Sequence, residues 1–116
     1  MEIQEKNDVT VIVMDERFDA ALGRELKDIV QNMGDQTTIK LVIDLSKTSF
    51  IDSSASGALV FCWRSAKKNN GDMKITGPSD HVKSLFRLTR IDTVVKLYDN
   101  VEAALESFAQ NESMPE

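Results

Sequence analysis

The 116-residue sequence is poor in the residues that carry most catalytic and metal-binding chemistry. Cys62 is its one cysteine and His81 its one histidine, so the chain can form neither an internal disulfide nor a Cys/His zinc site. We expect Cys62 to be a buried structural thiol and His81 a surface residue. The sequence also lacks a P-loop and a GxGxxG motif, the fingerprints of phosphate and dinucleotide binding. These absences predict a protein with no catalytic residue, no metal, no cofactor and no enzymatic activity.

Positive charge and long apolar runs are scarce as well. Fourteen Lys and Arg stand against 19 Asp and Glu, and the resulting net charge of −5 disfavours nonspecific binding to nucleic acid or anionic membranes. No apolar run approaches the ~20 residues that span a bilayer. The first residues contain no apolar core typical of a signal peptide. We therefore expect a cytoplasmic protein that does not insert into a membrane and does not bind nucleic acid.

Segments rich in β-branched and apolar residues alternate with segments of helical periodicity. Residues 9–14, 39–45, 72–76 and 94–98 are predicted strands, and residues 2–6 are predicted to pair with 9–14 in a hairpin. Apolar residues at steps of three or four predict helices in the intervening segments and after residue 99. Strands that alternate with helices indicate a layered α/β or α+β structure.

The starts of three predicted helices fall at residues that commonly cap helices. Asp19 and Ser79 can each accept a hydrogen bond from a free amide of the first turn. Asp99 with Glu102 has the spacing of a capping box. The first of these helices is expected to end at Gly34-Asp35.

Serines gather where the second helix, predicted over about residues 54–68, begins. Ser53, Ser54 and Ser56 follow Asp52 directly, and Ser53 is placed at the N-cap or nearby. A cap needs one hydroxyl, whereas this segment supplies three. Two interpretations stay open from the residues alone: a capped helix start, or a modifiable rim of an interface.

The same helix has an unusual outer face. At 100° per residue its core stripe comprises Ala55, Ala58, Leu59, Cys62 and Ala66. Gly57, Arg64 and Lys68 lie opposite this stripe, with Val60 and Phe61 on the flanks. A glycine beside partly exposed apolar side chains would let another surface approach closely. The alternative is that Phe61 and Trp63 pack under neighbouring loops.

One ordered set of motifs resembles the STAS domain of bacterial anti-sigma-factor antagonists. A strand ends in Asp44-Leu45-Ser46, and residues 50–57 follow as Phe-Ile-Asp-Ser-Ser-Ala-Ser-Gly. A Phe18-Asp19 step before the first helix and the segments 71–75, 82–86 and 91–95 also fall at family positions. The resemblance implies a mixed central sheet of about five strands with about four helices packed against it. We expect a single STAS-like domain over residues 1–110. Because the last residues are polar and end in Pro-Glu, we expect a disordered tail over 111–116.

By this resemblance Ser53 is the phosphorylation target, and Ser54 and Ser56 are less favoured sites. The implied partner is an anti-sigma factor that is also a serine kinase of the ATPase type. The unphosphorylated chain would sequester this kinase, phosphorylation would release it, and a serine phosphatase would reset the switch. The implied contact surface comprises Asp19, Asp52, Ser54, Gly57, Val60, Phe61 and Arg64.

Two departures from the family pattern bear on the choice of partner. Ala55-Ser56 stands where the family commonly has Gly-Leu, and Glu16 replaces a common glycine. One alternative is a STAS regulator of another output, such as secretion, biofilm formation or a signalling enzyme, through a similar kinase. Another is a cytoplasmic STAS subunit of a membrane transporter, which needs no phosphorylatable serine.

Overall fold

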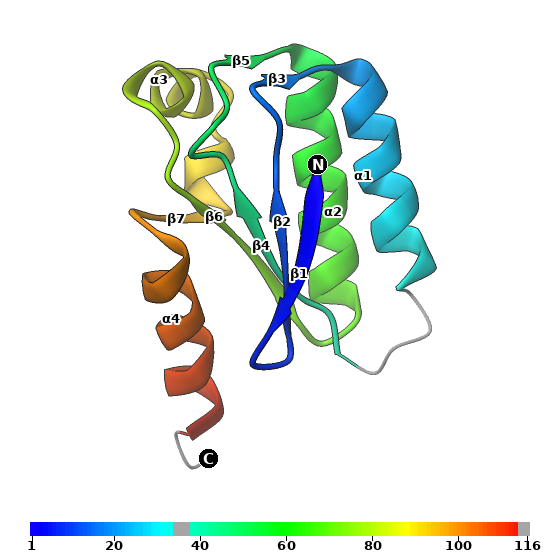
Figure 1. The fold of residues 1–116 in the computed structure, drawn as a ribbon, viewed down its shortest axis with the longest axis vertical. Coiled ribbons are helices and arrows are strands. Elements are labelled where there is room, and N and C mark those ends of the chain that lie inside the picture. The colour runs from blue at the N-terminus through cyan, green and yellow to red at the C-terminus, as the bar shows by residue number, and fades with distance from the viewer. Residues whose placement is uncertain (34–37, 114–116) are drawn as a thin grey trace.

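The computed structural model describes the backbone of residues 1–33 and 38–113 and the side chains of those up to residue 110 (Figure 1). Strands and helices alternate along the chain, as the sequence predicts. In order, they are β1 (Glu2–Lys6), β2 (Val9–Val13), β3 (Arg17–Phe18), α1 (Ala20–Asn32), β4 (Lys40–Asp44), β5 (Phe50–Ile51), α2 (Ser53–Lys68), β6 (Asp72–Thr76), α3 (Asp80–Leu88), the 3-10 turn η1 (Ile91–Thr93), β7 (Lys96–Tyr98) and α4 (Val101–Ser113).

The main sheet is mixed and has five strands in the order β1-β2-β4-β6-β7. β1 and β2 form the predicted antiparallel hairpin, and the other neighbouring strands pair in parallel. Asn7 and Asp8 both have positive φ, of 54° and 67°, as expected for a two-residue turn that matches the twist of a hairpin. These observations confirm the predicted α/β fold with a mixed five-stranded sheet and four helices.

Helices cover both faces of the sheet. Figure 1 shows α1 and α2 side by side on one side of the strands and α4 on the other. On the first face, alternate strand residues such as Ile12, Leu41 and Ile75 pack under α1, α2 and α3. On the second face, Val11 and Val42 pack under α4. Because both faces are covered, the central strands are apolar on both sides.

Some element boundaries differ from the sequence expectation. The last helix is capped by Asn100 rather than Asp99, since the Ala103 amide donates to Asn100 Oδ1 at 2.9 Å. The predicted end of the first helix at Gly34-Asp35 lies outside the described residues, and α1 is described to Asn32. The α4 backbone continues to Ser113, past the boundary expected at residue 110. None of the helices in the described part of the chain is long and apolar enough to cross a membrane.

Candidate functional site

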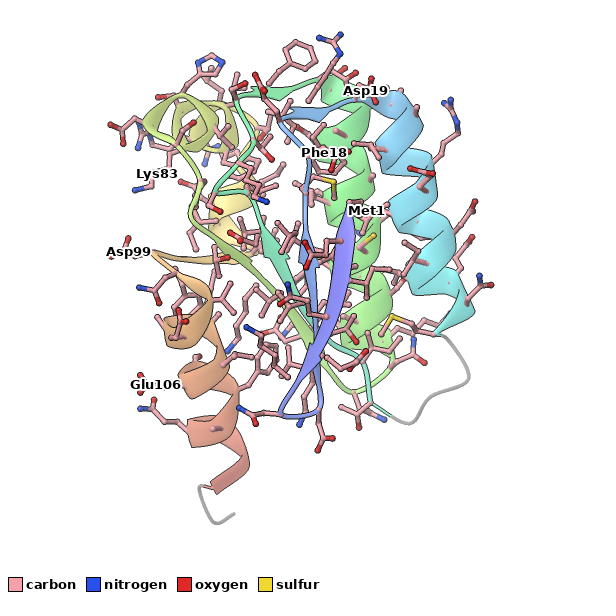
Figure 2. All side chains as sticks on the ribbon, in the orientation of Figure 1. Met1, Phe18, Asp19, Lys83, Asp99 and Glu106 are labelled. Carbon is pink, nitrogen blue, oxygen red and sulfur yellow. The ribbon has the colours of Figure 1, made fainter. Side chains whose placement is uncertain are left out.

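The start of α2 is fixed by a small parallel pairing at one end of the molecule. β3 pairs with β5, with Arg17 opposite Phe50, and the Asp52 amide then donates to the Phe18 carbonyl at 3.3 Å. Phe18 and Ile51 of these strands are buried in the core. This pairing joins the starts of α1 and α2 (Figure 1), which is why their N-caps, Asp19 and Asp52, lie at the same end. Figure 2 shows Asp19 at this end.

Asp52, not Ser53, is the N-cap of α2. Its Oδ1 accepts from the Ala55 amide at 2.8 Å, and its carbonyl accepts from the Ser56 amide at 3.1 Å. Ser53 is therefore the first residue of the helix, one position after the cap, which agrees with its predicted placement at the N-cap or nearby. A carboxylate at this position also interacts favourably with the positive end of the helix. Capping by Asp52 leaves the Ser53 hydroxyl without a structural task.

The three candidate serines differ in exposure. Ser53 and Ser54 are exposed, and within the described residues neither hydroxyl takes part in a hydrogen bond. Ser56 is buried, with 9% of its surface exposed, because it lies on the side of α2 that turns toward the domain. The structure thus presents two of the three hydroxyls to solvent, at what we call the Asp-Ser corner: Asp19, Asp52, Ser53 and Ser54.

Arg17 and Phe50 border the Asp-Ser corner, and sequence reasoning missed this pair. The Arg17 guanidinium lies 4.1 Å from the centre of the Phe50 ring, and its Nε lies 3.5 Å from Asp19 Oδ2. Asp19 in turn caps α1 by accepting from the Leu22 amide at 3.2 Å. No sequence signal links residues 17 and 50, because their contact depends on the β3–β5 pairing.

The remaining predicted contact residues extend from the corner along α2. Gly57 and Arg64 are exposed, and a Cβ atom added at Gly57 would meet nothing within 4 Å. Val60 and Phe61 are half-buried and pack against the main core. Phe61 lies beside α1 rather than under a loop, with Lys27 Nζ 5.1 Å from its ring centre. The predicted surface therefore consists of the Asp-Ser corner and one face of α2. Within that helix face, Val60 and Phe61 are partly buried against the core.

Cys62 and His81 lie in the environments that the sequence predicts for them. Cys62 is fully buried, and burial raises the pKa of its thiol to about 12 while the Lys27 charge opposes this shift. A thiol with so high a pKa stays protonated at neutral pH and is a poor nucleophile. His81 is exposed on α3, as expected. Among residues 1–33 and 38–113, no three His, Cys, Asp or Glu side chains are grouped so that they could hold a metal ion.

The structure defines a small α/β domain with an exposed Asp-Ser corner, and comparison with known proteins identifies its family. The family model for the STAS domain matches residues 1–104. The chain belongs to the STAS domain family.

Two relatives carry antagonist names. A Thermotoga maritima protein named as an anti-sigma factor antagonist is 31% identical over 67 residues, which cover 58% of this chain and 59% of that protein. The match thus spans less than two thirds of that relative's length. The anti-sigma-B factor antagonist of Listeria monocytogenes is 26% identical over 106 residues, covering 90% of this chain and 92% of that protein.

Solved structures share the fold at low sequence identity. The Bacillus cell fate determinant SpoIIAA in its phosphorylated form is similar with a TM-score of 0.71 and 18% identity, covering 92% of this chain and 97% of that one. A sulfate transporter family protein from Wolinella succinogenes reaches a TM-score of 0.82 at 14% identity, covering 96% of this chain and 93% of that one. At these identities the likeness concerns the fold alone.

Proposed function

We propose that this chain is an anti-sigma-factor antagonist that works by partner switching. In its unphosphorylated form it binds and sequesters an anti-sigma factor that is also an ATPase-type serine kinase. Phosphorylation of Ser53 releases that partner, and a serine phosphatase restores binding. The observation that carries the proposal is the exposed, unbonded Ser53 hydroxyl directly after the Asp52 cap. The antagonist names of the T. maritima and L. monocytogenes relatives support it.

The local geometry is compatible with a phosphate that leaves the fold intact. Ser53 is the first residue of a 16-residue helix, whose free first-turn amides favour a nearby anion. Its side chain is exposed, so a phosphoryl group needs no rearrangement of the core. The structural neighbour SpoIIAA was solved in a phosphorylated form, which shows that this fold tolerates the modification in that protein.

The effect on a docked partner would be large. A phosphate adds about −1.5 to −2 charges at pH 7, here directly after Asp52 and at the end of the molecule where Asp19 caps α1. An interface that accommodated a hydroxyl would then have to desolvate a dianion. A loss of ~3 kcal/mol in binding free energy would weaken the complex by more than a hundredfold. Ser54 is also exposed and remains a less favoured site, and the burial of Ser56 weighs against modification there without local opening.

Phosphorylation in vitro tests the proposal. The protein is incubated with its cognate anti-sigma factor/kinase and Mg-ATP, and the phosphorylated residue is mapped by mass spectrometry. We expect phosphate on Ser53, its loss in Ser53→Ala, and constitutive kinase binding by that variant in calorimetry. Ser53→Asp should bind at least tenfold more weakly while its circular dichroism stays native, whereas Ser84→Asp on the exposed side of α3 should bind normally. Absence of phosphate from Ser53, Ser54 and Ser56 would refute the switch.

The phosphorylation assay, combined with a sigma-factor binding assay on the kinase and with membrane fractionation, separates the alternatives. A kinase that phosphorylates Ser53 but binds no sigma factor would assign the chain to another output, such as secretion, biofilm formation or a signalling enzyme. A transporter subunit would co-fractionate with membranes and would not require a phosphorylatable serine. The likeness to the Wolinella protein concerns the fold alone. Because a transporter subunit would not need the exposed Ser53 hydroxyl, this hydroxyl favours the antagonist role.

A further inference from the structure

A groove of about 470 Å³ follows the outer seam between α1 and α2. Gly23 and Ala58 form its floor, where the two helices approach so closely that a Cβ atom at Gly23 would lie 3.3 Å from Ala58 Cβ. Phe61 lines one wall and also lines a second hollow further along the same seam, which includes Lys68. The two hollows adjoin at Phe61, and we call them together the α1–α2 track. The track follows helices of 13 and 16 residues, of which the shorter is roughly 20 Å long at 1.5 Å per residue.

The track is positively charged on a protein of net charge −5. Arg24 and Lys27 line its upper part and Lys68 its lower part, and no carboxylate lines either hollow. Helix α2 as a whole contains three basic residues and no acidic one. Among the described residues no carboxylate forms an ion pair with these three lining cations. Their charges are thus available to an external anion, which is unusual on a predominantly acidic surface.

The shape and the apolar floor of the track favour an acidic amphipathic helix over a nucleic acid as its ligand. The Phe61 ring and the small floor residues offer an apolar contact surface between the basic walls, with Lys27 over the ring at 5.1 Å. An amphipathic helix can present apolar side chains to such a floor and carboxylates to its walls. A nucleic acid would also have to approach the remaining acidic surface of the chain, which repels it.

We propose that the α1–α2 track binds an acidic amphipathic helix of a protein partner, with Arg24, Lys27 and Lys68 pairing with its carboxylates and Phe61 contacting its apolar side. This surface begins at Ser54 of the Asp-Ser corner, continues along α2, and shares Gly57 and Phe61 with the contact surface expected for the switch partner. Recognition of an acidic helix goes beyond the proposed switch, since it requires neither phosphorylation nor the Ser53 hydroxyl.

Titration of the full, 15N-labelled chain with two synthetic peptides tests the proposal. The first is a helix of about 14 residues, or about four turns, with glutamates flanking a stripe of Leu and Ala. The second carries glutamine in place of each glutamate. We expect the acidic peptide to cause saturating shifts in the amide resonances of Gly23, Gly57 and Phe61, and the neutral peptide to bind at least tenfold more weakly. Raising the salt concentration should weaken the acidic peptide further.

Charge-reversed variants test whether the basic residues of the track bind the acidic peptide. Arg24→Glu combined with Lys27→Glu should weaken binding of the acidic peptide about tenfold or more. Lys83→Glu with Arg87→Glu makes the same charge change on α3, away from α1 (Figure 2), and should leave binding unchanged. Native circular dichroism of both variants keeps the comparison valid. Equal binding of the neutral peptide, no shifts with the acidic one, or the same shifts produced by inorganic phosphate or by raising the protein concentration alone would each overturn the proposal.

Discussion

The two faces of the sheet are built differently. Under α1, α2 and α3, twenty buried residues form one continuous apolar cluster in the described part of the chain. Under α4, the corresponding cluster has five buried residues in the described part of the chain, and a buried charged side chain, Lys74, lies against it. Lys74 is 1% exposed, donates to Ser107 Oγ at 2.5 Å, and lies 4.1 Å from the centre of the Phe108 ring. The first face therefore has the larger apolar cluster, and the second combines a smaller one with a buried cation.

This difference indicates where the domain is rigid. The Asp-Ser corner is attached to the face with the large core through the buried Phe18 and Ile51, so the core holds this corner in place. The α4 layer has fewer buried apolar contacts, and such regions open locally at lower free energy. We therefore attribute the positioning of the site to the first face and expect the α4 layer to contribute less to global stability.

The largest expected effect comes from truncating the same residue type on each face. Leu59 of α2 is fully buried, whereas Leu105 of α4 is half-buried. Leu59→Ala should lower the free energy of unfolding by about 3 kcal/mol, and Leu105→Ala by about 1 kcal/mol. Urea denaturation measures both values. Equal losses would show that the two faces contribute alike and would break the comparison.

The second effect concerns the buried cation. Lys74→Ala removes a buried side chain and should cost about 2 kcal/mol of unfolding free energy. Lys74→Met keeps the volume, loses the charge that is costly to desolvate, and should stay within about 1 kcal/mol of wild type. The α4 amides should exchange hydrogen fastest in Lys74→Ala, whereas their exchange in Lys74→Met should stay close to that of wild type. A Met variant as unstable as the Ala variant would mean that the ammonium group itself, through Ser107 and the rings, holds α4 in place.

Local sequence patterns predicted most of the first face. The periodic stripe Ala55, Ala58, Leu59, Cys62 and Ala66 is buried as expected, since a helix on a sheet exposes one face and buries the other. Asp19 and Ser79 cap their helices as predicted, because capping depends on side chains within one turn. The cap at Asn100 was misassigned by one residue, since Asp99 and Asn100 are both good caps and only the backbone decides between them.

Contacts between distant segments could not be predicted in the same way. The Arg17–Phe50 stack requires the two short strands β3 and β5, which have no periodicity to detect. The burial of Lys74 was also missed, because a lysine in a strand is expected to face solvent unless a particular helix covers it. The basic lining of the α1–α2 track combines side chains from two helices, so net charge and composition conceal it.

The third effect uses the thiol of Cys62 to test whether water reaches the core on the α1, α2 and α3 face of the sheet. The thiol pKa is raised by burial from 9.0 to about 12, so between these values the unfolded chain loses the proton and the folded chain keeps it. Stability is therefore unaffected by this group below pH 9 and falls as the pH rises toward 12. The loss should be about 1 kcal/mol at pH 10, on the order of one pKa unit. Unfolding of wild type and Cys62→Ala is compared at pH 8 and pH 10. A constant difference between them would mean that water reaches the thiol in the folded state.

The smallest expected effect has opposite signs at two glycines, Gly57 in helix α2 and Gly77 in the turn after β6. Gly57 faces open space on the outside of α2, and a helical alanine there should raise the free energy of unfolding by up to about 1 kcal/mol. Gly77 has a φ of +65°, and a Cβ atom there would lie 3.0 Å from Ser46 Cβ, near the Asp44 carboxylate that lines the hollow before α4. Gly77→Ala should therefore lower stability by about 1 kcal/mol.

Thermal unfolding of both variants, followed by titration of Gly57→Ala with the partner, separates stability from docking. If the α2 face contacts a partner closely, Gly57→Ala will be more stable yet bind more weakly, because its new methyl group occupies the space that the partner would fill.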